Sequence, residues 1–131
     1  MRTYSLAAML VLVLLPLAHA QAPQQIPSID GGAGRCSVLL TVIADGKPVF
    51  TADVKVHIEY GFMGVRRLDL EAYTNQAGQV RFTGLPIKVH RPPLEFRGSK
   101  DQLSGVATYD PANECDAKHD VPLQKQAPAS Q

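Results

Sequence analysis

The fold of this 131-residue chain is decided by Ala44–Pro86, ADGKPVFTADVKVHIEYGFMGVRRLDLEAYTNQAGQVRFTGLP. Apolar and polar residues alternate in it over Asp53–Tyr60 and again over Arg66–Thr74, which is the period-two pattern of half-buried strands. Turn residues such as glycine and asparagine separate these runs. Short alternating strands that recur about every 8–12 residues are typical of a β-sandwich. The sequence therefore predicts an all-β domain with almost no helix.

The two alternating runs also predict how they pair with each other. In an antiparallel hairpin, residues directly opposite one another share a face, so a turn centred on Met63 fixes every pair. That register places Glu59 opposite Arg67, and His57 opposite Asp69. Both pairs have complementary charge when the imidazole is protonated. The neighbouring register would place His57 opposite Arg67 and lose this match, so we expect the first one.

Further strand signals complete the predicted domain, which covers residues 36–123. Between Ile87–Val89 and Leu94–Phe96 the Pro92–Pro93 pair excludes a central strand, because proline cannot donate to a strand ladder. The other predicted strands are Cys36–Ala44, Gln79–Thr83, Leu103–Tyr109 and Cys115–Val121. Together they predict a single Ig-like or transthyretin-like antiparallel β-sandwich of about seven strands.

Polar segments flank this domain. Residues 21–35 are rich in proline, glutamine and glycine and are predicted to be a flexible leader. Residues 124–131 are predicted to be a disordered tail.

The first twenty residues have the features of a signal peptide. Arg2 precedes the apolar run Leu6–Leu15, and Ala18-His19-Ala20 supplies the small residues that signal peptidase accepts. An uncleaved membrane anchor is the alternative, but the run is shorter than the ~20 residues that span a bilayer. We predict cleavage after Ala20, a secreted or periplasmic protein, and no membrane insertion after cleavage.

Two cysteines, Cys36 and Cys115, are predicted to form a structural disulfide, because an even number of cysteines in an exported chain favours pairing. A redox-active pair is the alternative, but the sequence has no Cys-x-x-Cys motif. We expect the bridge to connect the first predicted strand to the last.

Charge and motifs exclude several classes of function. The formal charge is +1, and loss of Arg2 makes the processed chain neutral, which favours neither nucleic acid nor anionic lipid as a partner. No phosphate-binding loop, dinucleotide fingerprint or Gly-x-Ser-x-Gly motif occurs, so no cofactor is predicted. The histidines at 57, 90 and 119 lack metal-ligand spacing. The polar group Asp110, Asn113, Glu114 and Asp116 is interpreted as an Asx-rich turn rather than a calcium site.

Three segments resemble the transthyretin-like, carboxypeptidase regulatory-like modules of exported bacterial proteins, a pattern that bacterial Ig-like domains share. These segments are Val38–Val49, Val54–Ile58 and Thr74–Pro86. The resemblance implies a non-enzymatic module that acts by binding a protein or cell-surface partner. A related hydrolase family ends in Tyr-Arg-Gly-Ser, which Phe96-Arg97-Gly98-Ser99 resembles, but 32 residues follow this motif, so we interpret it as a chance match.

Two surfaces are candidates for contact with such a partner. Phe62 and Met63 lie at a predicted hairpin tip, and Arg91 lies in the proline-rich loop. Folding of Phe62 back over the end of the sandwich is the favoured alternative. The runner-up hypothesis is a small exported enzyme or metal-dependent binder with a site built from loops. That hypothesis requires a cleft with converging polar groups among His57, His90, Arg97 and His119. A structural subunit of an envelope assembly, which would have ordered tails, is the third hypothesis.

Overall fold

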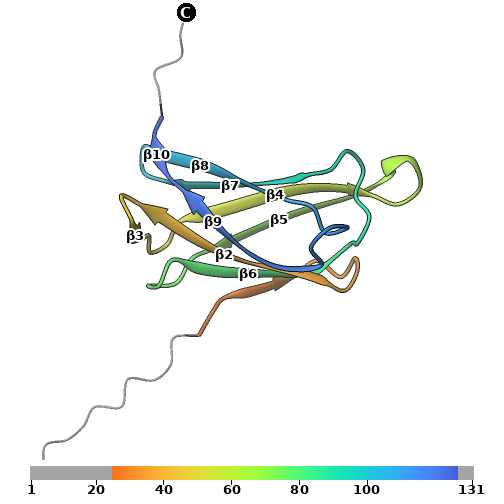
Figure 1. Ribbon diagram of the computed structural model, residues 1–131, viewed down its shortest axis with the longest axis horizontal. Coiled ribbons are helices and arrows are strands. Elements are labelled where there is room, and N and C mark those ends of the chain that lie inside the picture. Colours follow the sequence, from red (N-terminus) through yellow and green to blue (C-terminus); the bar gives the residue numbers. More distant parts are fainter. Residues whose placement is uncertain (1–24, 127–131) are drawn as a thin grey trace, which may run out of the picture.

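Two packed β-sheets form the domain in the computed structural model, which describes residues 25–126 (Figure 1). The predicted signal peptide and its cleavage site, residues 21–24 and residues 127–131 lie outside the described residues. The described part contains ten strands and one short 3-10 turn, η1 (Phe62–Gly64). The predicted all-β sandwich is therefore confirmed, with more strands than the sequence predicts.

The strands divide evenly between the two sheets. The first sheet has the order β1 (Ser28–Asp30), β6 (Gln79–Leu85), β2 (Cys36–Ala44) and β3 (Lys47–Pro48), and β9 (Asp116–Pro122) also pairs with β2. The second sheet has the order β10 (Gln124–Lys125), β8 (Leu103–Tyr109), β7 (Leu94–Lys100), β4 (Asp53–Tyr60) and β5 (Arg66–Tyr73). The long hairpin of the sequence analysis is thus β4–β5, at one edge of the second sheet.

The predicted register of the β4–β5 hairpin is confirmed. Glu59 pairs with Arg67, and His57 pairs with Asp69. The apolar side chains of β4 are buried between the sheets, while its polar side chains point to the outer face. One face of the hairpin therefore supplies core packing and the other carries a row of charged groups.

The pairing differs from the prediction in that the sandwich is not wholly antiparallel. β2 pairs with β9 in parallel, and β1 pairs with β6 in parallel. After β8 the chain crosses through the turn at residues 110–115 to the other sheet, and this crossing brings β9 alongside β2 in the same direction. Such non-local pairs leave no turn signal in the sequence.

Three strands differ from the boundaries predicted from sequence. β1 lies within residues 21–35, where a flexible leader is predicted, and β10 lies within the predicted tail. β1 is held by backbone hydrogen bonds to β6, such as the one that Arg81 N–H donates to Pro27 at 2.8 Å. β7 is a full strand because both prolines of the proline-rich loop precede Leu94, where the strand begins.

The core between the sheets is apolar and contains an aromatic row. The ring centroids of Phe82 and Phe96 are 5.0 Å apart, and those of Phe96 and Tyr109 are 6.2 Å apart. The Tyr109 hydroxyl donates to the carbonyl oxygen of Cys115 at 2.5 Å. Burial, with a smaller effect of nearby carboxylates, raises the pKa of Tyr109 to about 12.

The predicted disulfide between Cys36 and Cys115 is confirmed, with a Cα–Cα distance of 4.6 Å. It joins the start of β2 to the residue before β9, and Ser37 N–H donates to the Cys115 carbonyl at 2.9 Å beside it. A disulfide fits an exported protein, because reducing compartments keep thiols free. Within residues 25–126, no helix has the length and apolar character needed to cross a membrane.

Candidate functional site

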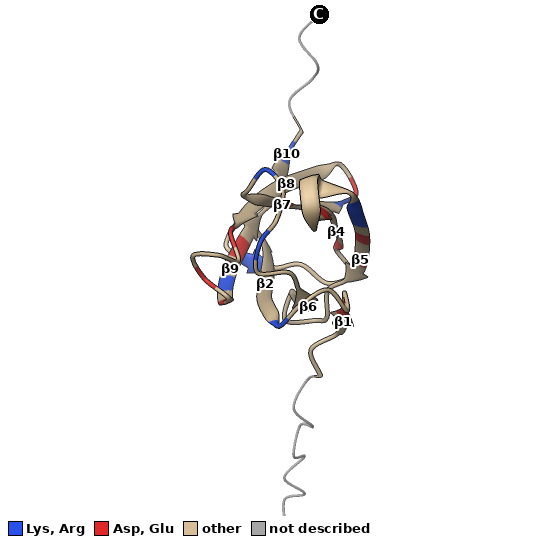
Figure 2. Cartoon of the chain, turned by 90° about the vertical axis from the view of Figure 1, so that its right-hand side faces the viewer, with Lys and Arg blue, Asp and Glu red and all other residues tan. Residues whose placement is uncertain are grey.

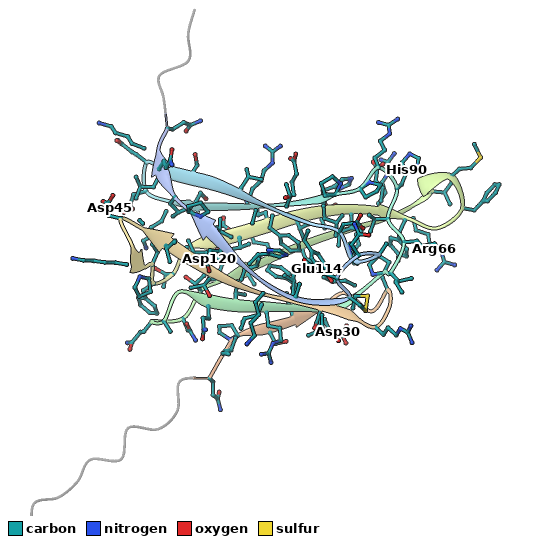
Figure 3. The ribbon with its side chains drawn as sticks, viewed as in Figure 1. Asp30, Asp45, Arg66, His90, Glu114 and Asp120 are labelled. Carbon is teal, nitrogen blue, oxygen red and sulfur yellow. A yellow bond between two sulfur atoms is a disulfide. The ribbon has the colours of Figure 1, made fainter. Side chains whose placement is uncertain are left out.

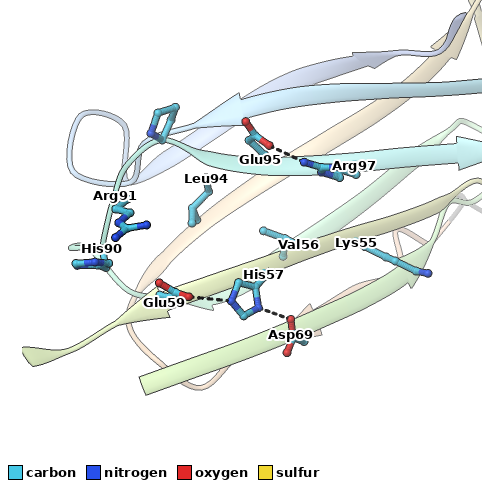
Figure 4. Close-up of a pocket in the computed structure, with 11 residues that line it drawn as sticks. Lys55, Val56, His57, Glu59, Asp69, His90, Arg91, Leu94, Glu95 and Arg97 are labelled. Carbon is cyan, nitrogen blue, oxygen red and sulfur yellow. Dashed lines mark hydrogen bonds and ion pairs between the residues drawn. The ribbon is translucent and has the colours of Figure 1, made fainter. Parts of the chain in front are cut away.

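A polar cleft of about 600 Å³ lies on the outer face of the second sheet, beside the proline-rich loop (Figure 4). β4 and β5 form one side, and the loop at residues 90–93 and the start of β7 form the other. The polar side chains that line it are Lys55, His57, Glu59, Asp69, His90, Arg91, Glu95 and Arg97. The apolar part of the lining comes from Val56, Pro93 and Leu94. The cleft therefore offers charged groups around a small apolar surface.

His57 lies between two carboxylates in this cleft (Figure 4). Its Nδ1 is 2.6 Å from Asp69 Oδ1, and its Nε2 is 3.3 Å from Glu59 Oε1. Both contacts are satisfied when both ring nitrogens carry a proton. The hydrogen bond to Asp69, followed by that to Glu59, raises the pKa of His57 above its ordinary value. The ring is thus held by Asp69, and the longer contact to Glu59 is the easier one for a ligand to replace.

The cations of the cleft differ in how far they are already paired. Arg97 Nη2 is 3.1 Å from Glu95 Oε2, and Lys55 Nζ is 3.6 Å from Asp53 Oδ2. The Arg91 side chain has no ion pair or hydrogen bond within residues 25–126. Its φ is +57°, a left-handed conformation that costs a non-glycine residue roughly 1–3 kcal/mol. Arg91 is therefore an available cation on a constrained stretch of backbone.

The proline-rich loop is fixed against the β4–β5 hairpin. His90 N–H donates to the Glu59 carbonyl at 2.7 Å, and Val89 forms an isolated bridge with Tyr60. A Cβ added to Gly64 would lie 2.7 Å from Cγ of the His90 ring. The backbone of η1 therefore packs closely on the imidazole, which sets the position of the loop that carries Arg91.

Three of the four residues that the enzyme hypothesis requires converge on this cleft. His57, His90 and Arg97 line it. His119 does not, because it lies on β9 in the other sheet, with Nε2 at 2.9 Å from Glu114 Oε2. The cleft carboxylates Glu59, Asp69 and Glu95 and the apolar Leu94 were not singled out as site residues from the sequence. The hairpin register already placed the first two near His57, but the approach of β7 is a non-local contact.

The hairpin tip differs from the favoured sequence interpretation. Phe62 is 82% exposed and Met63 is 76% exposed, so Phe62 does not cap the sandwich. The chain turns outward there because Gly61 and Gly64 both adopt positive φ. Arg91, predicted as part of a second contact surface, lines the cleft instead of standing apart from it.

The acidic turn at residues 110–116 has the geometry of an Asx turn. Asp110 Oδ1 accepts from the Ala112 N–H at 3.1 Å, and its carbonyl accepts from the Asn113 and Glu114 N–H groups. No group of three or more histidine, cysteine or acidic residues within the described range could hold a metal ion.

Comparison with known proteins returns likenesses of fold. No protein-family model matches the chain, and no curated protein matches it. One matching solved structure is catechol 1,2-dioxygenase from Pseudomonas arvilla C-1, at a TM-score of 0.53 and 14% identity. Another is catechol 1,2-dioxygenase from Acinetobacter sp. ADP1, inhibited by bound mercury, at a TM-score of 0.49 and 14% identity. Each alignment covers 79% of this chain and 60% of the other, so this chain spans less than two thirds of those structures.

These matches correct two expectations. The match with a TM-score above 0.5 is a catechol 1,2-dioxygenase and not a transthyretin-like or Ig-like module, so the resemblance proposed from sequence is wrong. The expectation of a non-enzymatic interaction module is corrected by the same finding, because this structural neighbour is an enzyme. At 14% identity the likeness establishes a shared fold and leaves the chemistry to the residues of this chain.

Proposed function

We propose that this protein is a small exported enzyme that binds a small organic anion in the cleft and transfers a proton through His57. The observation that carries the proposal is the imidazole of His57, held by Asp69 at 2.6 Å and facing a cleft that also contains Arg91. A histidine oriented by a carboxylate is a common general acid and base, since it titrates near neutral pH.

The geometry supports separate roles for the two ring nitrogens. Asp69 keeps the proton on Nδ1 and stabilises the imidazolium. Nε2 contacts Glu59 at 3.3 Å, a distance at which the hydrogen bond is weaker, so a substrate oxygen that displaces Glu59 receives the Nε2 proton. In the reverse direction, Nε2 of the neutral imidazole accepts a proton from the substrate oxygen.

The charges of the lining support an anionic substrate. Three permanent cations face three carboxylates, so the cleft is balanced when its imidazoles are neutral and becomes positive when His57 is protonated. Arg91 supplies a guanidinium without an ion pair among residues 25–126, and Leu94 with Pro93 supplies apolar surface. An organic carboxylate matches this combination of features.

Binding is tested by nuclear magnetic resonance of the histidine ring protons, with benzoate and inorganic phosphate as probes. We expect benzoate to shift the His57 resonances and to raise the His57 pKa further, because an anion stabilises the imidazolium. Arg91→Gln should weaken this binding at least about 10-fold. The matched control is His119→Gln, which removes a histidine from the other sheet. Equal binding by the Arg91→Gln variant would contradict the proposed anion site.

Turnover is tested by incubating the protein with a mixture of small metabolites and following all masses over time. We expect at least one anionic compound to be consumed by the wild-type protein and by His119→Gln, but not by His57→Gln. If His57→Gln consumes the same compounds at the same rate, proton transfer by His57 is excluded.

The proposal includes export through a cleaved signal peptide, as the sequence predicts. The presence of a disulfide supports an oxidising compartment. Intact-mass measurement of the protein recovered from its producing cells should give a chain that starts at Gln21. A mass that retains residues 1–20 would exclude cleavage after Ala20.

A further inference from the structure

The end of the β4–β5 hairpin projects beyond the rest of the sandwich (Figure 1), and side chains extend outward from it (Figure 3). Phe62, Met63 and Val65 are 82%, 76% and 71% exposed. We call residues 61–65 the tip. Apolar side chains gathered on a protruding turn are candidates for burial against something outside the chain.

The backbone holds these side chains outward. Gly61, Met63 and Gly64 have φ values of +80°, +55° and +69°, and the Val65 N–H donates to the Phe62 carbonyl at 3.2 Å. The packing of Gly64 against His90 ties the turn to the neighbouring loop. The tip is therefore preorganised, and binding through it costs little conformational entropy.

Basic residues gather behind the tip. Residues 59–67 and 88–91 lie side by side, and they contain four permanent cations and one carboxylate, a formal charge of +3. The cations are Arg66, Arg67, Lys88 and Arg91. Figure 2, which views the molecule from this end, shows basic residues at the start of β5. The near-neutral charge of the whole chain, on which the sequence prediction of no anionic lipid partner rests, conceals this local excess, and the proposal below replaces that prediction.

Shape and charge together distinguish between the candidate partners. A specific protein interface buries about 800 Å² on each side, whereas this surface has three apolar side chains on a convex turn with charged neighbours. A lipid bilayer needs no matching pocket, because it accepts apolar side chains among its acyl chains and attracts the cations behind them. We propose that the tip docks on an anionic phospholipid surface, with Phe62 and Met63 inserted and the basic residues at the headgroups.

The absence of tryptophan from the sequence allows a local test. Phe62→Trp places a single reporter at the tip, and Phe50→Trp is the matched control, since Phe50 is 53% exposed in the loop before β4. Vesicles of phosphatidylglycerol and phosphatidylcholine should shift the Phe62→Trp emission to shorter wavelength, and brominated acyl chains should quench it. Vesicles of phosphatidylcholine alone should leave it unchanged. The Phe50→Trp emission should change with neither vesicle.

The charge requirement is tested in the Phe62→Trp background. Arg66→Gln together with Arg67→Gln should weaken binding to anionic vesicles about 10- to 30-fold, as expected for loss of two cations near the surface. Lys47→Gln with Lys125→Gln removes two cations from strands β3 and β10 and should leave binding unchanged. Equal unfolding midpoints exclude a folding defect.

Three outcomes would overturn the proposal. These are unchanged Phe62→Trp emission on anionic vesicles, an equal shift on phosphatidylcholine alone, and a shift that depends on protein concentration without any vesicle. The last outcome would instead indicate contact between copies of the chain. Because the reporter lies at the tip, attachment through another part of the molecule leaves its emission unchanged.

Discussion

His57 determines the charge of the cleft, because its partners Asp69 and Glu59 both favour the protonated ring. A group whose pKa is raised on folding binds a proton more tightly in the folded state. Its contribution to the free energy of unfolding is fully present below the ordinary histidine pKa and is lost as the pH rises through the folded value. The His57–Asp69 contact therefore stabilises the protein under mildly acidic conditions.

Replacing Asp69 with asparagine tests this account at the level of one contact. The Asp69→Asn substitution removes the carboxylate whose hydrogen bond is the largest cause of the raised His57 pKa, so we expect the pKa to fall towards its ordinary value. The pH titration of the His57 ring protons measures the change. Asp120→Asn, on the exposed face of β9, is the control. An unchanged His57 pKa would mean that the 2.6 Å contact does not persist in solution.

Tyr109 gives a prediction of the same sign at alkaline pH. Its pKa is raised to about 12, so the stability that its neutral hydroxyl contributes is complete below about pH 10 and is lost as the pH rises through 12. Tyr109→Phe removes the hydrogen bond to the Cys115 carbonyl and should lower the free energy of unfolding by about 1 kcal/mol at neutral pH. Urea unfolding from pH 7 to pH 11.5 should show this difference shrinking only at the alkaline end.

At the scale of the element, η1 depends on a close approach between backbone and ring. Gly64→Ala adds a methyl group 2.7 Å from the His90 ring at a φ of +69°. Gly46→Ala has a similar φ of +74° with nothing within 4 Å, so it isolates the backbone strain. We expect Gly46→Ala to lower the unfolding free energy by about 1 kcal/mol through backbone strain alone, and Gly64→Ala to lower it by at least about 1 kcal/mol more.

The His90 resonances provide the second measurement for this pair of variants. Gly64→Ala should shift them, because the ring must move, and Gly46→Ala should not. Equal destabilisation with unchanged His90 resonances would show that η1 and the proline-rich loop are not packed together in solution.

Local patterns predicted the elements whose partners are near in sequence. Alternation and charge matching predicted the β4–β5 register, and the pairing of His57 with Asp69 followed from it. The parallel β2–β9 and β1–β6 pairs were not predicted, because the two strands of each pair are far apart in the sequence and no turn signal connects them. The residues of the cleft also divide into those placed by local pairing and those placed by non-local packing. His57 could be placed from its own hairpin, whereas the approach of Arg91 depends on how the proline-rich loop packs.

At the scale of the whole molecule, the disulfide closes a loop of 79 residues that contains most of the described chain. A cross-link of this length limits the unfolded ensemble and should contribute about 4.5 kcal/mol, which is a large part of the stability of a small domain. We expect the Cys36→Ala/Cys115→Ala variant to unfold at much lower urea concentration. Reduction of the wild-type protein with dithiothreitol should reproduce the loss, and an unchanged midpoint would contradict a stabilising role.

The same bridge determines how the protein responds to mechanical force. The ends of the described chain lie outside the loop, so tension applied through them passes directly across the disulfide from residue 36 to residue 115. While the disulfide is intact, tension can extend only the short flanking segments that carry β1, β9 and β10. Reduction would free about 270 Å of further contour length, at ~3.4 Å per residue over the 79 residues of the loop. A force spectrometer should record this added length only after reduction, because the intact disulfide keeps the loop closed.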